Sequence, residues 1–245
     1  MYTTIFRLTQ FAFLTGSDPE TYSISMPAKN SLKFYIENGY YHIYNRGVEK
    51  RDIFLDENDY RMFLYQLKYY LGIPKEDDIK QKKRSIRSEI VLLGYCLMPN
   101  HFHLFIKQLT KTGMTKLLRA ICTNYVCYFN KRYKRVGTLF QGKYKAALIE
   151  NEPNLLHVSR YIHINPLELD RVGPWKGSDP LGQYPYSSYS FYLGLKAADW
   201  LNSNEILGYF KSAQKIHLRD ILSYQSFVED YPVDSKDYIK NLALE

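Results

Sequence analysis

Apolar and polar residues alternate over several short stretches between residues 40 and 149, a pattern typical of β-strands. The alternation, or a continuous apolar run, predicts four strands at residues 40–44, 90–97, 101–107 and 143–149. The turn signal Asn45-Arg46-Gly47 ends the first strand, and Met98-Pro99-Asn100 forms a tight connection. The second and third strands are therefore expected to follow one another directly.

Apolar residues spaced three or four positions apart predict helices between these strands. The first helix is expected to begin after Asp56, a good N-cap residue, and to end at Gly72. A later helix is opened by an Asn-Glu-Pro sequence at 151–153 and must end near Asn165, because a proline follows. The apolar stripes of the two earlier helices consist of Tyr60, Phe63, Leu64, Leu67 and Tyr70, and of Met114, Leu117, Leu118, Ile121, Tyr125 and Tyr128.

The elements follow the order strand, helix, strand, strand, helix, strand, helix. This order predicts an α+β fold, a ferredoxin-like β-α-β-β-α-β core with an antiparallel sheet and one appended helix, over residues 31–172. Residues 1–30 are polar and without periodicity, which indicates an extension that is either disordered or the product of a mis-assigned start. Residues 173–245 are interpreted as a C-terminal extension, a loop rich in Gly, Pro, Ser and Tyr followed by short helices near 203–212 and 214–229.

The composition is that of a folded chain. Of its residues, 45% are hydrophobic and 24% are charged, which argues against disorder. The length of 245 residues suits one sizeable core, or one core plus a tail, rather than several full domains. The three cysteines, Cys96, Cys122 and Cys127, form no CxxC pair and are expected to be free thiols in a reducing compartment. No apolar run approaches the roughly 18–20 residues that span a bilayer. We therefore expect the protein in the cytoplasm.

Positive charge is concentrated in one region. The chain carries a net charge of +8, but residues 79–147 hold fifteen Lys or Arg and one acid, Glu89, for a local net charge of +14. Such a block favours a nucleic-acid surface over a membrane surface, since no segment joins this charge to a deep apolar face. Taken singly, each cluster is explained equally well as a solvated helix end or loop. The candidate DNA-binding residues are Asn45 and Arg46, which lie outside this region, and Lys131, Arg132, Lys134, Arg135, Lys143 and Lys145.

Two histidines, His101 and His103, lie two positions apart on the third predicted strand. Side chains alternate along a strand, so both imidazoles leave one face of the sheet and Phe102 leaves the other. Two converging imidazoles form half of a divalent-metal site. Both neighbouring strands are apolar, so the pair is expected centrally in the sheet, where buried imidazoles need a partner. The alternative is a purely structural role.

A second group of candidates lies on the last predicted core helix. Tyr161 and Asn165 are four residues apart and therefore share one face. A phenol with a pKa of about 10 is a poor nucleophile, but an ion that polarises a phosphodiester lowers the demand on it. Asn165 offers an amide oxygen as a third ligand, and His157 could contact a phosphate or move a proton. Packing is the alternative for Tyr161 and His157, and Tyr125 and Tyr128 are rival nucleophiles.

The strings GYCLMPNHFH at 94–103 and YIHINP at 161–166 carry a resemblance to a known family. Further strings that match are YHIYNRG at 41–47, the stretch 54–60, YFN at 128–130 through GTLFQG at 137–142, and YSSY at 186–189. Together they span about residues 35–195, and they resemble the single-tyrosine HUH transposases, above all the REP-associated tyrosine transposases.

The resemblance implies a ferredoxin-like nuclease that acts on single-stranded DNA, often at hairpins. Under it, His101 and His103 would bind Mg²⁺ or Mn²⁺, and Tyr161 would attack the scissile phosphate. The products would be a 5′-phosphotyrosine adduct and a free 3′-hydroxyl, whose reverse attack rejoins strands. Insertion-sequence relatives commonly carry Gln where this chain has Asn165, which shortens the reach of this third ligand by one methylene. We expect single-stranded DNA containing a hairpin as the partner, and a monomer or homodimer.

Two other functions fit part of this pattern. A non-catalytic, domesticated nucleic-acid-binding protein could use the same scaffold, although the joint presence of His101, His103, Tyr161 and Asn165 speaks against it. A replication initiator or relaxase could share the histidine pair. Relaxases usually place the tyrosine upstream of that pair, and initiators carry a further domain, whereas this sequence has no GxxxxGK[ST] loop.

Overall fold

The computed structural model describes residues 30, 33–76, 85–169, 180–215 and 223–230, together with residues 235, 239 and 242. Apart from Asn30, the expected N-terminal extension lies outside these residues, as do residues 77–84. Within the described part of the chain, no helix is both long enough and apolar enough to cross a membrane.

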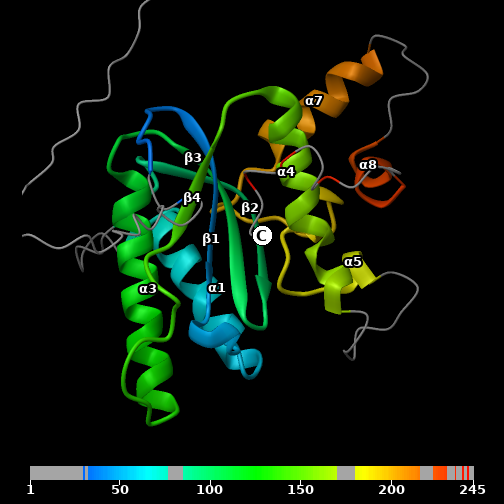
Figure 1. Cartoon of the computed structure of the whole chain (residues 1–245). Coiled ribbons are helices and arrows are strands. Elements are labelled where there is room, and N and C mark those ends of the chain that lie inside the picture. The colour runs from blue at the N-terminus through cyan, green and yellow to red at the C-terminus, as the bar shows by residue number, and fades with distance from the viewer. Residues whose placement is uncertain are drawn as a thin grey trace, which may run out of the picture.

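A four-stranded sheet forms the centre of the molecule (Figure 1). Its strands are β1 (Gly39–Arg46), β2 (Ile90–Met98), β3 (His101–Gln108) and β4 (Lys145–Ile149). They lie in the order β2-β3-β1-β4, and every neighbouring pair is antiparallel. This is the ferredoxin-like order, so the predicted fold class is confirmed, and β3 lies between two strands as expected.

Helices cover both faces of the sheet (Figure 1). α1 (Glu57–Leu71) and α3 (Gly113–Arg132) pack on one face, where they share an apolar cluster with side chains such as Ile43 and Phe102. α4 (Glu152–Ile164) packs on the opposite face in a second cluster. The smaller elements are η1 (Val48–Lys50), η2 (Asn165–Leu169), α5 (Pro180–Gln183), α6 (Tyr189–Tyr192), α7 (Asn204–Lys215) and α8 (Tyr224–Glu229).

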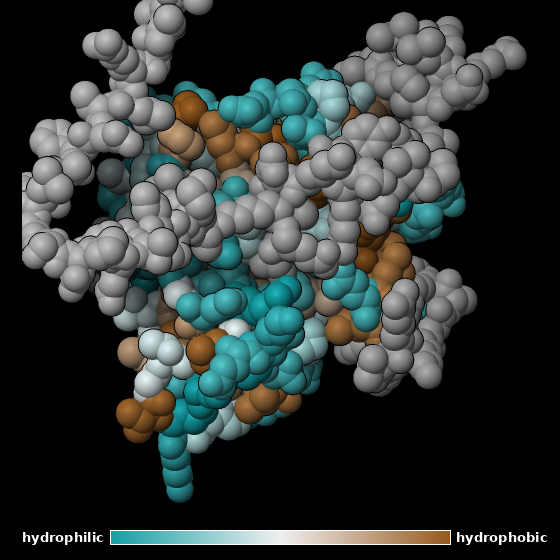
Figure 2. Space-filling view, in the orientation of Figure 1, coloured by the Kyte–Doolittle hydropathy of each residue, from teal (hydrophilic) through white to brown (hydrophobic). Residues whose placement is uncertain are grey.

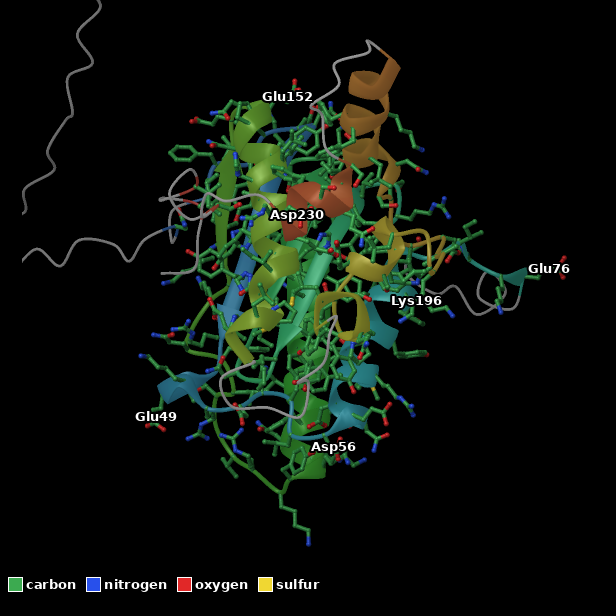
Figure 3. The ribbon with its side chains drawn as sticks, turned by 90° about the vertical axis from the view of Figure 1, so that its right-hand side faces the viewer. Glu49, Asp56, Glu76, Glu152, Lys196 and Asp230 are labelled. Carbon is green, nitrogen blue, oxygen red and sulfur yellow. The ribbon has the colours of Figure 1, made fainter. Side chains whose placement is uncertain are left out.

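Local signals in the sequence set the helix ends. The carboxylate of Asp56 accepts hydrogen bonds from the main-chain N–H groups of Asn58 and Asp59 and so caps α1, which ends before Gly72. Asn151 caps α4 in the same way. Figure 3 shows Asp56 at one end of the molecule and Glu152, the first residue of α4, at the other.

The C-terminal part of the chain packs against the α4 face of the sheet. Residues 186–188 lie along the outer edge of β2, where Leu97 N–H donates to the carbonyl of Tyr186 (2.9 Å) and Ser188 N–H donates to that of Tyr95 (2.9 Å). α8, which ends before Asp230, lies against α4 (Figure 3). The expected start of the last helix at 214 is wrong, because that residue belongs to α7 and α8 begins after its cap, Ser223.

Candidate functional site

The two histidines of β3 lie side by side on the α4 face of the sheet. The ring centroids of His101 and His103 are 4.8 Å apart with the ring planes at 87°. Phe102, between them, is buried in the cluster on the opposite face, as strand alternation predicts. Both imidazoles are almost completely enclosed, with 6% of His101 and 0% of His103 exposed.

The hydrogen bonds of these rings use only their Nδ1 atoms. His101 Nδ1 lies 2.6 Å from Oδ1 of Asn100, and the amide nitrogen of Asn100 donates to the carbonyl of Lys50 (3.2 Å). This second bond fixes Oδ1 as the atom that faces the ring, so His101 Nδ1 is the donor and Nε2 keeps its lone pair. His103 Nδ1 lies 2.8 Å from Nε2 of His42. The Nε2 atoms of His101 and His103 are buried and have no hydrogen-bond partner.

The environment keeps both imidazoles uncharged. Burial, and then the nearby charge of Arg46, lowers the pKa of His101 to about 3, and the side chain of Asn165 acts in the opposite direction. Burial also lowers the pKa of His103 well below its ordinary value, helped by His101 and His42 and again opposed by Asn165. Neutral imidazole is the form that binds a metal ion.

Tyr161 and Asn165 reach the same place from α4. The ring of Tyr161 is 2% exposed and stands edge-on to His103, with centroids 5.5 Å apart, and to His42, at 5.7 Å. Asn165, the residue after α4, donates from Nδ2 to the main-chain carbonyl of Tyr161 (2.6 Å). Because its side chain also acts on the pKa of both site histidines, Asn165 lies next to the pair. The structure thus brings His101, His103, Tyr161 and Asn165 together.

These residues fit a divalent metal ion. Two buried Nε2 atoms without partners are the kind of atoms that an ion satisfies, and the Asn165 amide would supply an oxygen ligand. Among the described residues, no group of three or more His, Cys, Asp or Glu could hold a metal. A site made of two imidazoles and one amide oxygen leaves several coordination positions for phosphate oxygens and water.

Arg46 and Asn45 have different positions relative to this site. Arg46 pairs with His101 in the β1–β3 register and lowers the pKa of both site histidines through its charge, so its guanidinium is near them. The Nε atom of Arg46 is buried without a hydrogen-bond partner. Asn45 pairs with Phe102 and therefore faces the other side of the sheet, where its Nδ2 donates to the carbonyl of Gly142 (3.0 Å).

The basic residues near the C-terminal end of α3 separate into two groups. Lys131, Lys134 and Lys143 are exposed. The end of α3 lies in the lower part of Figure 1, and hydrophilic residues gather in the lower part of the same view in Figure 2. Arg132 forms ion pairs with Asp56 and with Asp59 (3.1 Å), which join α3 to the start of α1.

The two remaining basic candidates are partly buried. The Arg135 guanidinium lies over the ring of Phe129, 5.6 Å from its centroid. Lys145, in β4, pairs with Tyr44 of β1, which in turn pairs with His103. Its side chain therefore leaves the same face of the sheet as the two site histidines, and it is partly buried.

The other chemical candidates have different surroundings. His157 contacts the C-terminal segment, with Nδ1 3.3 Å from Oγ of Ser235 and its ring against Phe227. Tyr125 donates from its hydroxyl to the carbonyl of Ile53 within the cluster on the α1–α3 face, so the sheet separates it from the histidine pair. Tyr128 donates to Asp59 (3.1 Å) on that side as well.

Sequence reasoning missed His42. It is fully buried and stacks on His103, with ring centroids 5.0 Å apart and planes at 14°. One signal in the sequence could have found it. His42 lies two residues before Tyr44 on an alternating strand, so its side chain leaves the same face of the sheet as that of Tyr44, which pairs with His103.

Comparison with known proteins shows that a protein-family model matches the sequence. The model of the family described as "Transposase IS200 like" matches residues 35–165, which is more than half of the chain. No curated protein matches the sequence.

Two solved structures are similar in part. A REP-associated tyrosine transposase bound to a REP hairpin is 18% identical, with a TM-score of 0.47, over 70% of this chain and 90% of that chain. A tRNA(His) guanylyltransferase from Saccharomyces cerevisiae is 12% identical, with a TM-score of 0.36, over 80% of this chain and 78% of that chain.

Proposed function

Since the chain belongs to the IS200-like transposase family, we propose that it is a metal-dependent endonuclease and strand transferase for single-stranded DNA. The observation that carries this proposal is the enclosure of two partnerless imidazole nitrogens, on His101 and His103, beside the ring of Tyr161. A purely structural histidine pair would be expected to satisfy these nitrogens, because a buried polar atom without a partner costs about 1–3 kcal/mol.

The metal ligands in this proposal are Nε2 of His101, Nε2 of His103 and Oδ1 of Asn165. Mg²⁺ and Mn²⁺ both suit the reaction, and Mn²⁺ should bind more firmly because it accepts imidazole more readily. When bound, the ion would polarise a phosphodiester of the DNA.

Tyr161 is the proposed nucleophile. Its phenol oxygen forms a bond to the scissile phosphorus, and the bond from phosphorus to the 3′-oxygen breaks. The phenol loses its proton and the leaving 3′-oxygen gains one, so the products are a 5′-phosphotyrosine and a free 3′-hydroxyl. Attack by a 3′-hydroxyl in the reverse direction joins strands without an external energy source. The Arg46 guanidinium, near both histidines, is suited to hold a phosphate oxygen during either step.

DNA binding is assigned to the exposed cations outside this centre. Lys131, Lys134 and Lys143 are exposed and lie in the region of concentrated positive charge. Residues 31–172 would form the catalytic domain, and a strand containing a hairpin is the proposed substrate.

Covalent trapping tests the proposal. The protein is incubated with single-stranded oligonucleotides that carry hairpins, in Mn²⁺, Mg²⁺ or a chelator, and the products are separated in SDS. We expect a protein–DNA adduct that requires metal, that Tyr161→Phe abolishes and that Tyr125→Phe retains. An adduct that survives Tyr161→Phe would identify another nucleophile. Salt-sensitive binding that ignores the chelator, with no adduct, would instead identify a non-catalytic nucleic-acid-binding protein.

A further inference from the structure

The C-terminal end of the chain reaches the histidine pair. His42 Nδ1 is hydrogen-bonded to the main-chain carbonyl of Leu242, which lies 200 residues later in the chain. The other nitrogen of the same ring, Nε2, lies 2.8 Å from Nδ1 of His103. His42 and His103 are both fully buried. A continuous line of hydrogen bonds therefore runs from the backbone at Leu242 to a proposed metal ligand.

The donor and the acceptor of each hydrogen bond in this line can be assigned by starting from the Leu242 carbonyl. A carbonyl oxygen can only accept, so His42 Nδ1 must carry the proton that Leu242 receives. The second nitrogen of a neutral His42 then has a lone pair and must accept, so His103 Nδ1 is the donor. His103 is fully buried, and a charge on a buried ring would need a partner of opposite charge, so the ring is taken as neutral. Its Nε2 consequently holds a lone pair, and this is one of the two nitrogens without a partner.

Described residues hold the end of the chain in place. Ser235 is fully buried and accepts a hydrogen bond from Nη1 of Arg160 on α4 (2.9 Å). Ile239 is 1% exposed and belongs to the apolar cluster on the α4 face, and Leu242 packs against the same cluster. The carbonyl of Leu242 is thus positioned by packing on the helix that carries Tyr161.

We propose that His42 is a positioning residue that keeps His103 in its Nδ1–H tautomer, and that the Leu242 carbonyl makes the C-terminal segment part of the active site. This inference rests on the proposed function, because it assigns a metal ion to Nε2 of His103. Outer hydrogen-bond partners of this kind orient a ligating imidazole, and their loss typically weakens metal binding about 10–100-fold.

Two variants of His42 separate hydrogen bonding from packing. His42→Phe keeps a ring of similar size and removes the acceptor, whereas His42→Gln places an amide oxygen where it can still accept from His103. Mn²⁺ affinity is measured on each full-length protein from the electron paramagnetic resonance signal of the free ion. We expect His42→Phe to bind Mn²⁺ about 10–100-fold more weakly and His42→Gln to stay close to the unchanged protein.

A second pair of variants tests the end of the chain. Leu242→Glu places a charge against the apolar cluster and should displace the carbonyl, and Leu195→Glu is the matched control at an exposed leucine (68% exposed). Leu242→Glu is expected to weaken Mn²⁺ binding, and Leu195→Glu is not. Equal Mn²⁺ affinity of Leu242→Glu and Leu195→Glu would overturn the role of Leu242.

The tautomer can be measured without any variant and without metal. Long-range ¹H–¹⁵N NMR spectra of the imidazoles should show protons on Nδ1 of both His42 and His103. A proton on Nε2 of His103, or unchanged Mn²⁺ affinity in His42→Phe, would overturn the inference and leave the proposed function standing. Failure of the unchanged protein to bind Mn²⁺ would overturn both.

Discussion

The ring of Tyr161 stands edge-on to the ring of His103, with centroids 5.5 Å apart and planes at 87°. The two residues meet because α4 lies across the sheet face from which both site histidines project. An edge-to-face pair of buried rings contributes packing energy that is independent of the phenol hydroxyl. Stability and chemistry at position 161 can therefore be separated by substitution.

Shortening Tyr161 should damage the fold much more than removing its hydroxyl. Tyr161→Ala leaves a cavity in the α4 cluster and is expected to cost about 3–5 kcal/mol of unfolding free energy. Tyr161→Phe keeps the ring and is expected to cost about 1 kcal/mol. Urea unfolding of both variants measures these values. Equal stability losses in the two variants would show that the ring does not pack as described.

Asn165→Asp should bind Mn²⁺ more tightly and fold less stably. The carboxylate adds a negative charge beside His101 and His103, which favours a cation. It also removes the amide donor that bonds the carbonyl of Tyr161 (2.6 Å), a loss of about 1–3 kcal/mol. Mn²⁺ titration and urea unfolding measure the two effects. Asn165→Leu is the control, since it removes the oxygen and should weaken Mn²⁺ binding, and tighter binding by that variant would contradict the ligand assignment.

Exposed and paired cations should differ in their effect on DNA binding. Lys131→Ala, Lys134→Ala and Lys143→Ala are each expected to reduce the slope of log affinity against log salt for a single strand by about 0.7, because each removes one phosphate contact. Arg132→Ala should leave the slope unchanged and lower the melting temperature, since Arg132 pairs with Asp56 and Asp59. Fluorescence anisotropy at several salt concentrations and a thermal melt make the comparison. A slope change confined to Arg132→Ala would reverse the assignment.

Much of the core could be predicted because its signals are local. Asp56 and Gly72 mark the two ends of α1, and Asn151 marks the start of α4. The spacing of His101 and His103 placed both on one face of a strand, which the structure confirms. Each of these inferences needs only residues within one helix or strand.

Other features depend on contacts between distant segments, which no periodicity in the sequence reveals. Ser188 accepts from the main-chain N–H of Tyr95 (2.9 Å), 93 residues away, and so belongs to the edge of the sheet. His42 meets Leu242 across 200 residues. Charge patterning placed Arg132 among the candidate DNA-binding cations but did not reveal its ion pairs with Asp56 and Asp59 at the start of α1.

A buried histidine that is not among the proposed metal ligands makes acid stability informative. His163 is 1% exposed, and both of its ring nitrogens are hydrogen-bonded, Nδ1 to the hydroxyl of Tyr224 (2.6 Å) and Nε2 to that of Ser188 (2.7 Å). Burial lowers the pKa of His163 to about 3, whereas an unfolded histidine has a pKa of about 6.5.

Replacing His163 should therefore reduce the loss of stability in acid. Between pH 6.5 and 3 the unfolded chain binds a proton at this position and the folded chain does not, so stability falls as the pH is lowered. From pH 7 to pH 5 the contribution is about 2 kcal/mol. His163→Gln, compared with the unchanged metal-free protein by urea unfolding at both pH values, should lose about 2 kcal/mol less over this interval, even if it is less stable at pH 7. The same pH dependence in both proteins would mean that His163 is protonated in the folded state, and that the hydrogen bonds to Tyr224 and Ser188 are not those of a neutral ring.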